Sequence, residues 1–463
     1  MRFLKICWIL SKYTLLYRLS SHSQDNFGKR LKLACEELGI TFIKIGQILS
    51  MRYDVLSKQN CAELQGLLDN VRPIPYIEVI KIIETEYQKP YQSIFKIFYQ
   101  EPLGSASVSQ VHRAELLNGS IVAVKIKRPN VNHQFLNDIA ILKTLARVCQ
   151  SFSVTLRNIQ VRKLVDSFEA WIKQDMDFVG EVRNIKKITE QYSFASAGFR
   201  SDLGKALFPS TFDELCTPNI IVMDFIDGIP MNRKAEILAN PNYDIEKSIS
   251  SYVNAAMRNW FREDTQAYYF QADPHLSNIL ALPNGDAATI DFGLISELSK
   301  KEARICQDLM IAVYLKDIKQ VMKFVSSMIG IDQARCEIMR PDLERYLEQT
   351  QHEGLGFWFL EVIRIVVKYR FKFPLFLATF GRTNLLLDGV IHEYMPAKTT
   401  LDLFGEELRR LAFREAWKNV LEADWLKLTY AVSQKIKEGP NIIGEFLDNP
   451  LGLVSQIVQT IKN

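Results

Sequence analysis

The stretch YYFQADPHLSNILALPNGDAATIDFGL, residues 268–294, places polar side chains between two apolar runs. The dipeptide Asn284-Gly285 is typical of a β-hairpin turn and accounts for the segment LPNGDA. A turn does not account for Asp273 or Asp291, because a carboxylate among buried side chains is costly unless a positive charge lies beside it. Two such carboxylates next to short strands predict a site that is completed by a cation.

Composition limits the classes of protein that need to be considered. The chain has 463 residues, which is enough for two or three compact units. Of these residues, 48% are hydrophobic and 24% are charged. The net charge of +4 gives no indication of a nucleic-acid partner. Seven cysteines without a CxxC pair and six histidines without an HExxH pattern argue against a zinc site, and the cysteines fit a reducing compartment.

The hydrophobic period changes along the chain. Residues 26–88 have helical spacing, whereas the segment from about residue 93 alternates and contains the hairpin signal Asn118-Gly119. Helical periods return over 132–151 and 160–192, and the chain after about residue 300 reads as helical throughout. The predicted class is α+β, and the predicted units are a helical N-terminal extension (1–92), an N-lobe (93–224), a C-lobe (225–345) and a C-terminal helical region (346–463).

Four separated motifs fit a single nucleotide site of the protein-kinase type. Lys125 lies in IVAVKIK on a strand after the hairpin, where kinases place an ammonium against ATP phosphates, and Glu181 on a following helix would hold it. Asp273 and Asn278 have the spacing of the kinase catalytic loop, and Asp291 begins an Asp-Phe-Gly triplet. Each motif alone is ordinary, since lysines on edge strands and glutamates on helices are usually solvated. The four in this order predict a bilobal kinase-like fold that binds Mg²⁺ through Asn278 and Asp291.

Two further segments would complete a nucleotide site. The hinge would be VMDFID, with Met223 at its inner end and the backbone from Asp224 to Ile226 meeting adenine. The phosphate-covering loop EPLGSASVSQVH has a single glycine where kinases have three, but its side chains are small: Gly104, Ser105, Ala106 and Ser107. After Asp291 the chain runs almost directly into a helix, without an Ala-Pro-Glu motif, so the usual platform for a peptide substrate is missing.

With these motifs the sequence resembles the UbiB/AarF/ADCK family of atypical kinase-like proteins over roughly residues 26–300. FIKIGQILSMRYDVL is similar to the family's K-x-G-Q signature and supplies Lys44, Gly46 and Gln47. DMDFVGEVRN resembles its E-x-D element, with Asp175 where glutamate is usual and Asp177 matching. PLGSASVSQVH is similar to its alanine-rich loop, and QADPHLSNIL resembles its catalytic loop.

The match has three departures. Gln271 stands where the family has histidine, Leu276-Ser277 replaces Pro-Gly, and Gly104 replaces alanine. None of these changes removes a predicted phosphate or metal ligand. They affect the stiffness of the loops and the preference for a nucleotide.

The resemblance implies a kinase fold whose N-terminal extension covers the site of a peptide substrate. Lys44 would pair with Asp175, and Gln47 would approach the catalytic loop. The implied activity is ATP hydrolysis with Mg²⁺, in which Asp273 acts as a base or orients water. The implied role is in ubiquinone or other isoprenoid-quinone synthesis, with lipid precursors and quinone-synthesis enzymes as partners. The implied location is the cytoplasm or, as a peripheral protein, the cytoplasmic side of the inner membrane.

Two segments bear on a membrane link. The first 20 residues read as a basic, aromatic helix that packs or lies on a membrane surface, and no apolar run reaches the ~18 residues that span a bilayer. The segment GFWFLEVIRIVVKYRFKFPLFLATF, residues 356–380, mixes aromatic and basic side chains, which suits either an interfacial helix or a plain core helix.

The sequence leaves two other functions open. One is a small-molecule kinase that phosphorylates a lipid or isoprenoid head group. The other is a non-catalytic scaffold that uses nucleotide binding as a conformational switch.

Overall fold

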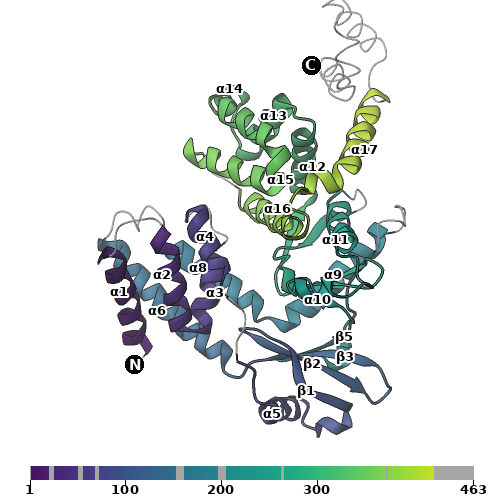
Figure 1. The fold of residues 1–463 in the computed structure, drawn as a ribbon. Helices are drawn as coiled ribbons and strands as arrows, with labels where there is room; N and C mark the ends of the chain where they lie inside the picture. Colours follow the sequence, from purple (N-terminus) through teal and green to yellow (C-terminus); the bar gives the residue numbers. More distant parts are fainter. Residues whose placement is uncertain are drawn as a thin grey trace, which may run out of the picture.

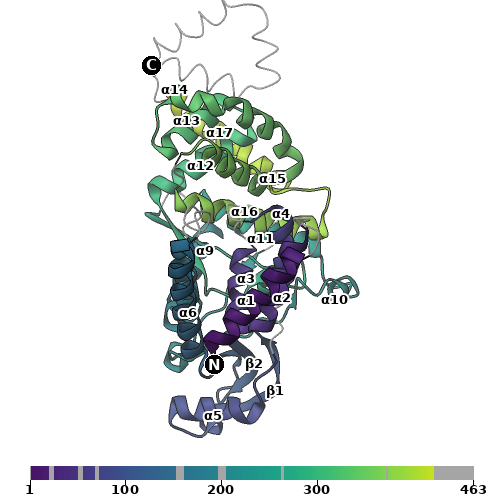
Figure 2. The ribbon, with the colours of Figure 1, turned by 90° about the vertical axis from the view of Figure 1, so that its left-hand side faces the viewer.

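The computed structural model describes residues 2–19, 25–50, 56–67, 72–152, 161–196, 205–261, 265–371 and 374–421. These residues form an α+β, two-lobed kinase-like fold with added helices at both ends, which confirms the predicted class (Figure 1). The sheet and its covering helix lie at one end, and the C-terminal helices lie at the other (Figure 2).

The N-terminal extension is a helical layer beside the two lobes. Its helices are α1 (Arg2–Leu19), α2 (Asp25–Leu38), α3 (Ile40–Leu49) and α4 (Lys58–Gln65). Their apolar faces meet in one cluster that includes Ile6, Ile9, Leu38 and Phe42, and a later helix, α6 (Val131–Phe152), packs against it. The extension is therefore joined to the rest of the molecule through α6 (Figures 1 and 2).

The N-lobe is built on a four-stranded antiparallel sheet in the order β1-β2-β3-β5. The strands are β1 (Phe95–Ser105), β2 (Ser109–Leu116), β3 (Ile121–Lys127) and β5 (Ile220–Asp224). The predicted hairpin turn joins β2 to β3, where Gly119 has a φ of 88° that favours glycine. One face of the sheet is covered by α5 (Tyr76–Tyr87), and η1 (Tyr91–Ser93) leads into β1.

Among the residues that the structure describes, three α-helices lie between β3 and β5. They are α6, α8 (Val161–Asp175) and α9 (Phe178–Ser196). The helical segment predicted over 160–192 is thus divided in two, because the chain turns between Asp175 and Phe178. Asp177 caps the new helix by accepting a hydrogen bond from the Gly180 N–H at 2.9 Å.

The C-lobe centres on α11 (Ile245–Trp260) and two small sheets. One sheet has the order β4-β9-β8-β6, and the other pairs β7 with β10. Their bounds are β4 (Ala206–Leu207), β6 (Ile229–Pro230), β7 (Ala267–Gln271), β8 (Ile279–Ala281), β9 (Ala287–Thr289) and β10 (Ile295–Ser299), with η3 (Asp213–Leu215), α10 (Lys234–Leu238) and η4 (Leu276–Asn278) between them. The predicted turn at Asn284-Gly285 joins β8 to β9, with φ values of 67° and 79°.

All described elements after β10 are helical, as predicted. They are α12 (Lys300–Tyr314), α13 (Ile318–Ile329), α14 (Gln333–Cys336), η5 (Glu337–Met339), α15 (Arg340–Lys368), α16 (Leu375–Tyr394) and α17 (Thr400–Leu421). Trp358 and Phe359 are fully buried, so the core-helix interpretation of segment 356–380 holds and the interfacial one is wrong. One core contains side chains of the C-lobe and of these helices, and it crosses the boundary predicted between residues 345 and 346.

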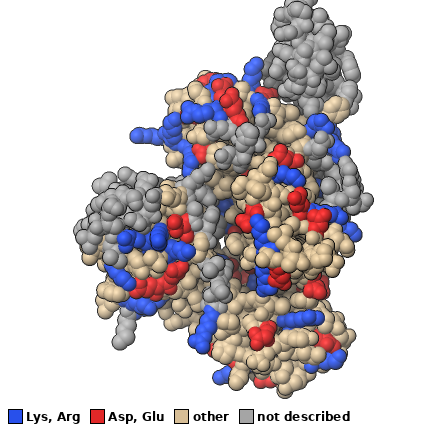
Figure 3. Space-filling view, in the orientation of Figure 1, with Lys and Arg blue, Asp and Glu red and all other residues tan. Residues whose placement is uncertain are grey.

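Among the described residues, none of the helices combines the length and the apolar character that crossing a bilayer requires. Lysines and arginines are interspersed with acidic residues over the face shown in Figure 3, in keeping with the small net charge.

Candidate nucleotide site

Lys125 lies at the centre of the candidate site. It sits on β3, opposite Val111 of β2 and Ile221 of β5, and only 10% of its side chain is exposed. Its Nζ lies 2.6 Å from Oε1 of Glu181 and 3.8 Å from Oδ2 of Asp291. The structure therefore brings together three residues that are up to 166 positions apart in the sequence (291 − 125).

Electrostatics keep this lysine charged in spite of its burial. Burial alone would lower the pKa of Lys125, but the carboxylates of Asp291 and Glu181 outweigh it and raise the pKa above its ordinary value. Burial likewise opposes ionisation of Asp291, yet Lys125 and the Gly293 N–H lower the pKa of this carboxyl. An ionised Asp291 beside a charged lysine suits the binding of phosphates and of a divalent cation.

The Asp-Phe-Gly segment is fixed from two sides. The Gly293 N–H donates to Oδ1 of Asp291 at 2.9 Å, and the Phe292 N–H donates to Oε1 of Glu181 at 3.4 Å. Phe292 itself is fully buried against Ala123 and Met223. Asp291 is thus held by backbone and core contacts, while 37% of its side chain stays exposed.

The catalytic-loop residues follow β7. Asp273 is about one-third exposed, and its Oδ1 lies 3.4 Å from Nη2 of Arg382 on α16. Asn278 ends η4, and its carbonyl accepts a hydrogen bond from the Ile290 N–H at 3.1 Å, directly before Asp291. The two predicted metal ligands, Asn278 and Asp291, therefore sit on adjoining backbone segments.

Gln271, which replaces the family's histidine, has a visible structural role. Its Nε2 donates to the carbonyl of Asp291 at 2.9 Å, and its Oε1 accepts from the hydroxyl of Tyr252 at 2.8 Å. The glutamine thus links α11 to the backbone of the Asp-Phe-Gly segment.

The phosphate-covering loop is the turn between β1 and β2. Arg128, just after β3, donates to the carbonyl of Ala106 at 2.7 Å and to the hydroxyl of Ser105 at 2.6 Å. Ser107 is buried, and a Cβ placed on Gly104 would meet no atom within 4 Å. The loop is therefore fastened at its base, and Gly104 has room for the alanine that the family pattern expects.

The hinge follows β5. Met223 is buried opposite Ala123, and the N–H groups of Asp224 and Phe225 donate to the carbonyls of Ser210 and Ile121. Two backbone donors of this stretch are thus already used within the fold. At this hinge, adenine would be bound by the backbone carbonyl groups of Asp224 and Phe225 and by the backbone of Ile226.

The N-terminal extension reaches the site through α3. The Nζ of Lys44 lies 3.1 Å from Oδ2 of Asp175 at the end of α8. A Cβ on Gly293 would come within 3.3 Å of an oxygen of both Asp175 and Asp291, so the two carboxylates converge beside this glycine. Gln47 donates to the carbonyl of Leu67 at 3.3 Å, a contact that lies within the extension.

The donor set around Asp291 fits Mg²⁺. Among the described residues no group of three His, Cys, Asp or Glu side chains could hold a metal alone. The predicted site instead combines the amide of Asn278 with the ionised carboxylate of Asp291, and nucleotide phosphates would supply the remaining oxygens. The role of these residues in metal binding stays a prediction.

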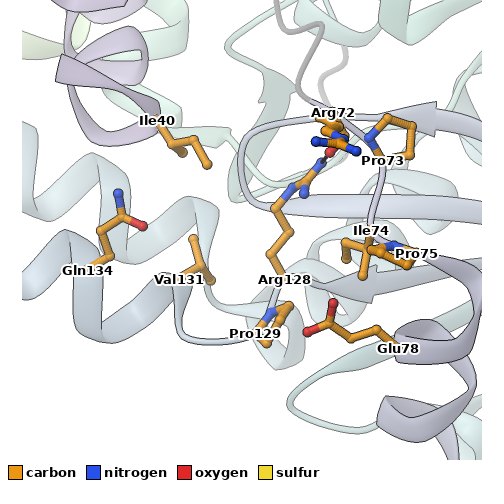
Figure 4. Close-up of a pocket in the computed structure, with 10 residues that line it drawn as sticks. All are labelled: Ile40, Arg72, Pro73, Ile74, Pro75, Glu78, Arg128, Pro129, Val131 and Gln134. Atoms are coloured by element: carbon orange, nitrogen blue, oxygen red, sulfur yellow. Dashed lines mark hydrogen bonds between the residues drawn. The ribbon is translucent and has the colours of Figure 1, made fainter. Parts of the chain in front are cut away.

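A separate cavity of about 480 Å³ is lined by Arg128 and by residues of α3, α5 and α6. Figure 4 shows Arg128 in its centre, between the Pro73–Pro75 segment and the start of α6. Lys125, Asp273 and Asp291 do not line this cavity. It is therefore distinct from the predicted nucleotide site.

Two charged residues near the site were not predicted from the sequence. Arg128 follows the VAVKIK motif directly, and Arg382 lies in the apolar helix LFLATFGRTNLLLDGV. A single arginine in such an apolar helix was an available signal, because buried charges need a reason. The signal gave no indication of which residue it faces.

Comparison with known proteins finds matches over most of the chain. Residues 66–325 match the ABC1 atypical kinase-like domain. An uncharacterized protein of the hydrogenase 1 5' region of Clostridium pasteurianum is 30% identical over 384 residues, which are 81% of this chain and 69% of that protein. A probable protein kinase UbiB of Shewanella halifaxensis is 26% identical over 401 residues, 84% of this chain and 70% of that protein. The structure of a Mycobacterium tuberculosis protein in complex with erythromycin is 19% identical in sequence. The match covers 76% of this chain and 91% of that protein's chain, with a TM-score of 0.44.

Proposed function

This chain belongs to the UbiB/AarF/ADCK family, whose ABC1 atypical kinase-like domain matches its residues 66–325, and from this membership we propose that it binds Mg-ATP and hydrolyses it in support of isoprenoid-quinone synthesis at a membrane surface. The observation that supports the proposal best is the buried ammonium of Lys125, held between Glu181 at 2.6 Å and Asp291 at 3.8 Å. Phosphate binding in a kinase site requires a charged lysine, and the two carboxylates beside Lys125 keep it charged.

Each polar side chain then has a distinct task. Lys125, oriented by Glu181, contacts the phosphates, and Asn278 with Asp291 holds Mg²⁺. A magnesium ion held by these two residues would supply positive charge that offsets the negative charge of the phosphates. Asp273 orients the attacking water or accepts its proton, since it is the remaining exposed carboxylate of the catalytic loop.

Water is the proposed acceptor because α3 of the extension lies beside the catalytic residues and would stand in the way of a protein substrate. Ile45 and Ile48 of α3 pack in one cluster with Phe168 and Ile172 of α8. Together with the Lys44–Asp175 ion pair, this packing anchors α3 next to Asp291. A protein substrate would have to displace that helix.

Turnover of radiolabelled ATP tests the proposal. Wild type should release phosphate in the presence of Mg²⁺, and Asp273→Asn should lower kcat about 10²-fold or more, as expected for loss of a general base. Asp166→Asn removes an exposed carboxylate that forms an ion pair with Lys143 at the surface and should keep wild-type turnover. Equal and negligible turnover for wild type and Asp273→Asn would contradict hydrolysis.

The same radiolabelled assay, together with the variant Lys125→Ala, separates the other two functions. A lipid or small-molecule kinase would transfer label to an extracted organic product in place of inorganic phosphate. A nucleotide-switched scaffold would lose its cellular function in Lys125→Ala and keep it in Asp273→Asn.

The quinone role is tested in cells that lack the protein. These cells should contain less quinone and accumulate an early precursor of it, and an unchanged lipid profile would contradict the role.

The proposed membrane surface includes one face of α1. Leu4, Trp8 and Leu15 are 70%, 61% and 58% exposed and share a face by their spacing, whereas Ile6 and Ile9 are buried in the extension. Exposed apolar and aromatic side chains on a basic helix suit the interface of a bilayer.

Sedimentation with anionic vesicles tests this surface. Trp8→Gln combined with Leu4→Gln should reduce vesicle binding, because both changes remove apolar area from the proposed contact. Ile77→Gln on α5, which alters a side chain that is 83% exposed elsewhere, should leave binding unchanged. Equal vesicle binding by all three proteins would remove α1 from the proposal.

A further inference from the structure

Arg382 is a buried arginine whose hydrogen-bond donors the described part of the fold does not satisfy. It lies on α16, outside the matched domain, and is 6% exposed. Its three guanidinium nitrogens are buried and have no hydrogen-bond partner among the described residues. A guanidinium offers five N–H donors, so an arginine without hydrogen bonds is an expensive way to fill space.

Two contacts fix the direction of this guanidinium. Its central carbon lies over the ring of Trp171 on α8, 4.9 Å from the ring centroid. Its Nη2 lies 3.4 Å from Oδ1 of Asp273, an ion pair across two parts of the fold. Burial lowers the pKa of Arg382, and Asp273 is the charged group that opposes this effect.

An apolar side chain would fill the same volume at a lower free-energy cost, since buried ion pairs rarely stabilise a protein more than packed hydrophobic groups do. The charge of Arg382 therefore needs an explanation other than packing. Asp273 is the residue that the structure offers for it, and Asp273 is also the proposed base or water-orienting group.

We infer that Arg382 is a positioning residue for Asp273, holding the catalytic-loop carboxylate from the C-terminal helices while Trp171 holds the guanidinium. Its effect on turnover rests on the proposed ATP hydrolysis. The ion pair itself does not rest on that activity. The inference gives α16 a direct part in the site, although no motif marks this helix.

Kinetics of Arg382 variants provide the first test. Arg382→Met should lower kcat for ATP hydrolysis roughly tenfold to a hundredfold, as expected when a reacting group is misplaced. KM for ATP should change less than about threefold, because the interaction concerns the reacting group and not nucleotide binding. Arg382→Lys restores a positive charge and should recover part of the lost kcat.

Arg364 provides the matched control. It lies in the same helical region, on α15, with Nη1 2.6 Å from Oε1 of the buried Glu361, so Arg364→Met, like Arg382→Met, deprives a carboxylate of its cation. Arg364→Met should lower the unfolding temperature and keep kcat per folded molecule. Wild-type kcat in Arg382→Met, or an equal loss of kcat in Arg364→Met, would overturn the inference.

Unfolding temperatures provide a test that needs no activity. Asp273→Asn should lower the unfolding temperature because it leaves a buried cation without its carboxylate. Adding Arg382→Met removes that cation, so the double variant should unfold at a higher temperature than Asp273→Asn alone. If the decrease in unfolding temperature of the double variant equals the sum of the decreases in the two single variants, the inference is overturned.

The two experiments separate failure of the inference from failure of the proposed function. If wild type hydrolyses no ATP, the proposed function falls, and the unfolding temperatures still decide whether Arg382 pairs with Asp273. If wild type hydrolyses ATP and Arg382→Met does so equally well, the inference falls and the proposed function stands.

Discussion

Lys125 owes its position to the alternation of side chains along β3. Its neighbours Val124 and Ile126 are fully buried on the face of the sheet that α5 covers. Lys125 must then point to the opposite face, where α9 places Glu181. The buried ammonium is tolerable because two carboxylates lie within reach of it, and one of them, Glu181, is more buried than the lysine itself.

Glu181→Gln tests whether the buried ammonium of Lys125 depends on the carboxylate of Glu181. The substitution keeps the shape but removes the closer negative charge, so the free energy of unfolding should fall by about 1–3 kcal/mol, the cost of a poorly satisfied buried group. Affinity for ATP should also fall, because Lys125 loses the group that orients it. Chemical denaturation and nucleotide titration measure the two effects. Glu297→Gln, at an exposed position on β10, should change neither, and an unchanged affinity in Glu181→Gln would contradict the orienting role.

Residues of the site differ in how far the sequence could predict them. Lys125, Asp273, Asn278 and Asp291 belong to motifs with fixed local spacing, so their elements could be predicted and their convergence followed from the kinase pattern. Arg382 could not be placed, since it faces Asp273 from a helix 109 positions later (382 − 273) and no spacing rule connects them.

At the scale of elements, the kink in α15 depends on one carboxylate. Gly354 has a φ of 84°, and the helix restarts beyond it with the Gly356 N–H donating to Oδ2 of Asp388 at 2.7 Å. The other oxygen of Asp388 accepts from the hydroxyl and the N–H of Thr400, at the start of α17. Asp388 on α16 thus joins three helices, and burial raises its pKa to about 6.

Stability should therefore depend on pH through Asp388. A carboxyl whose folded pKa is about 6 and whose ordinary value is 3.8 stabilises the fold fully below pH 3.8, and this contribution is lost as pH rises through 6. The loss should reach about 3 kcal/mol at most, taking 1.36 kcal/mol for each of the 2.2 units (6 − 3.8).

Urea denaturation between pH 4.5 and 7.5 measures this effect. The difference in unfolding free energy between wild type and Asp388→Asn should decline with rising pH, because the asparagine cannot titrate. Thr400→Val removes a hydrogen bond that lowers the pKa of Asp388, so the decline should move to higher pH in that variant. A difference that is constant over this range would show that Asp388 does not titrate there.

Elements were predictable where the information is local. Asn118-Gly119 and Asn284-Gly285 fix their turns through their own backbone preferences, and both hairpins are present. Segment 356–380 allowed two interpretations, because an aromatic and basic helix can face either lipid or a protein core. The segment spans the end of α15 and the start of α16, and the choice depended on the packing of these two helices against each other, which buries Phe359 against Phe380.

At the scale of the whole molecule, the C-lobe and the C-terminal helices share one core. Phe380 of α16 lies with its ring centroid 4.6 Å from that of Trp260 on α11 and 6.0 Å from that of Phe270 on β7. The ring centroid of Phe359 on α15 lies 5.3 Å from that of Phe380. These contacts hold α16, and with it Arg382, in a fixed relation to the catalytic loop that follows β7.

Phe380→Ala tests whether these regions behave as one unit. Removing a fully buried phenylalanine should cost about 3–5 kcal/mol of unfolding free energy. Because the cavity would lie between the C-lobe and the C-terminal helices, amide hydrogen exchange should speed up in α11, β7 and α16 together. Phe413→Ala, which truncates a half-exposed ring on α17, should cost less than about 0.5 kcal/mol. Faster exchange confined to α16 would show that the C-terminal helices unfold separately, and the ion pair between Arg382 and Asp273 would then open whenever α16 does.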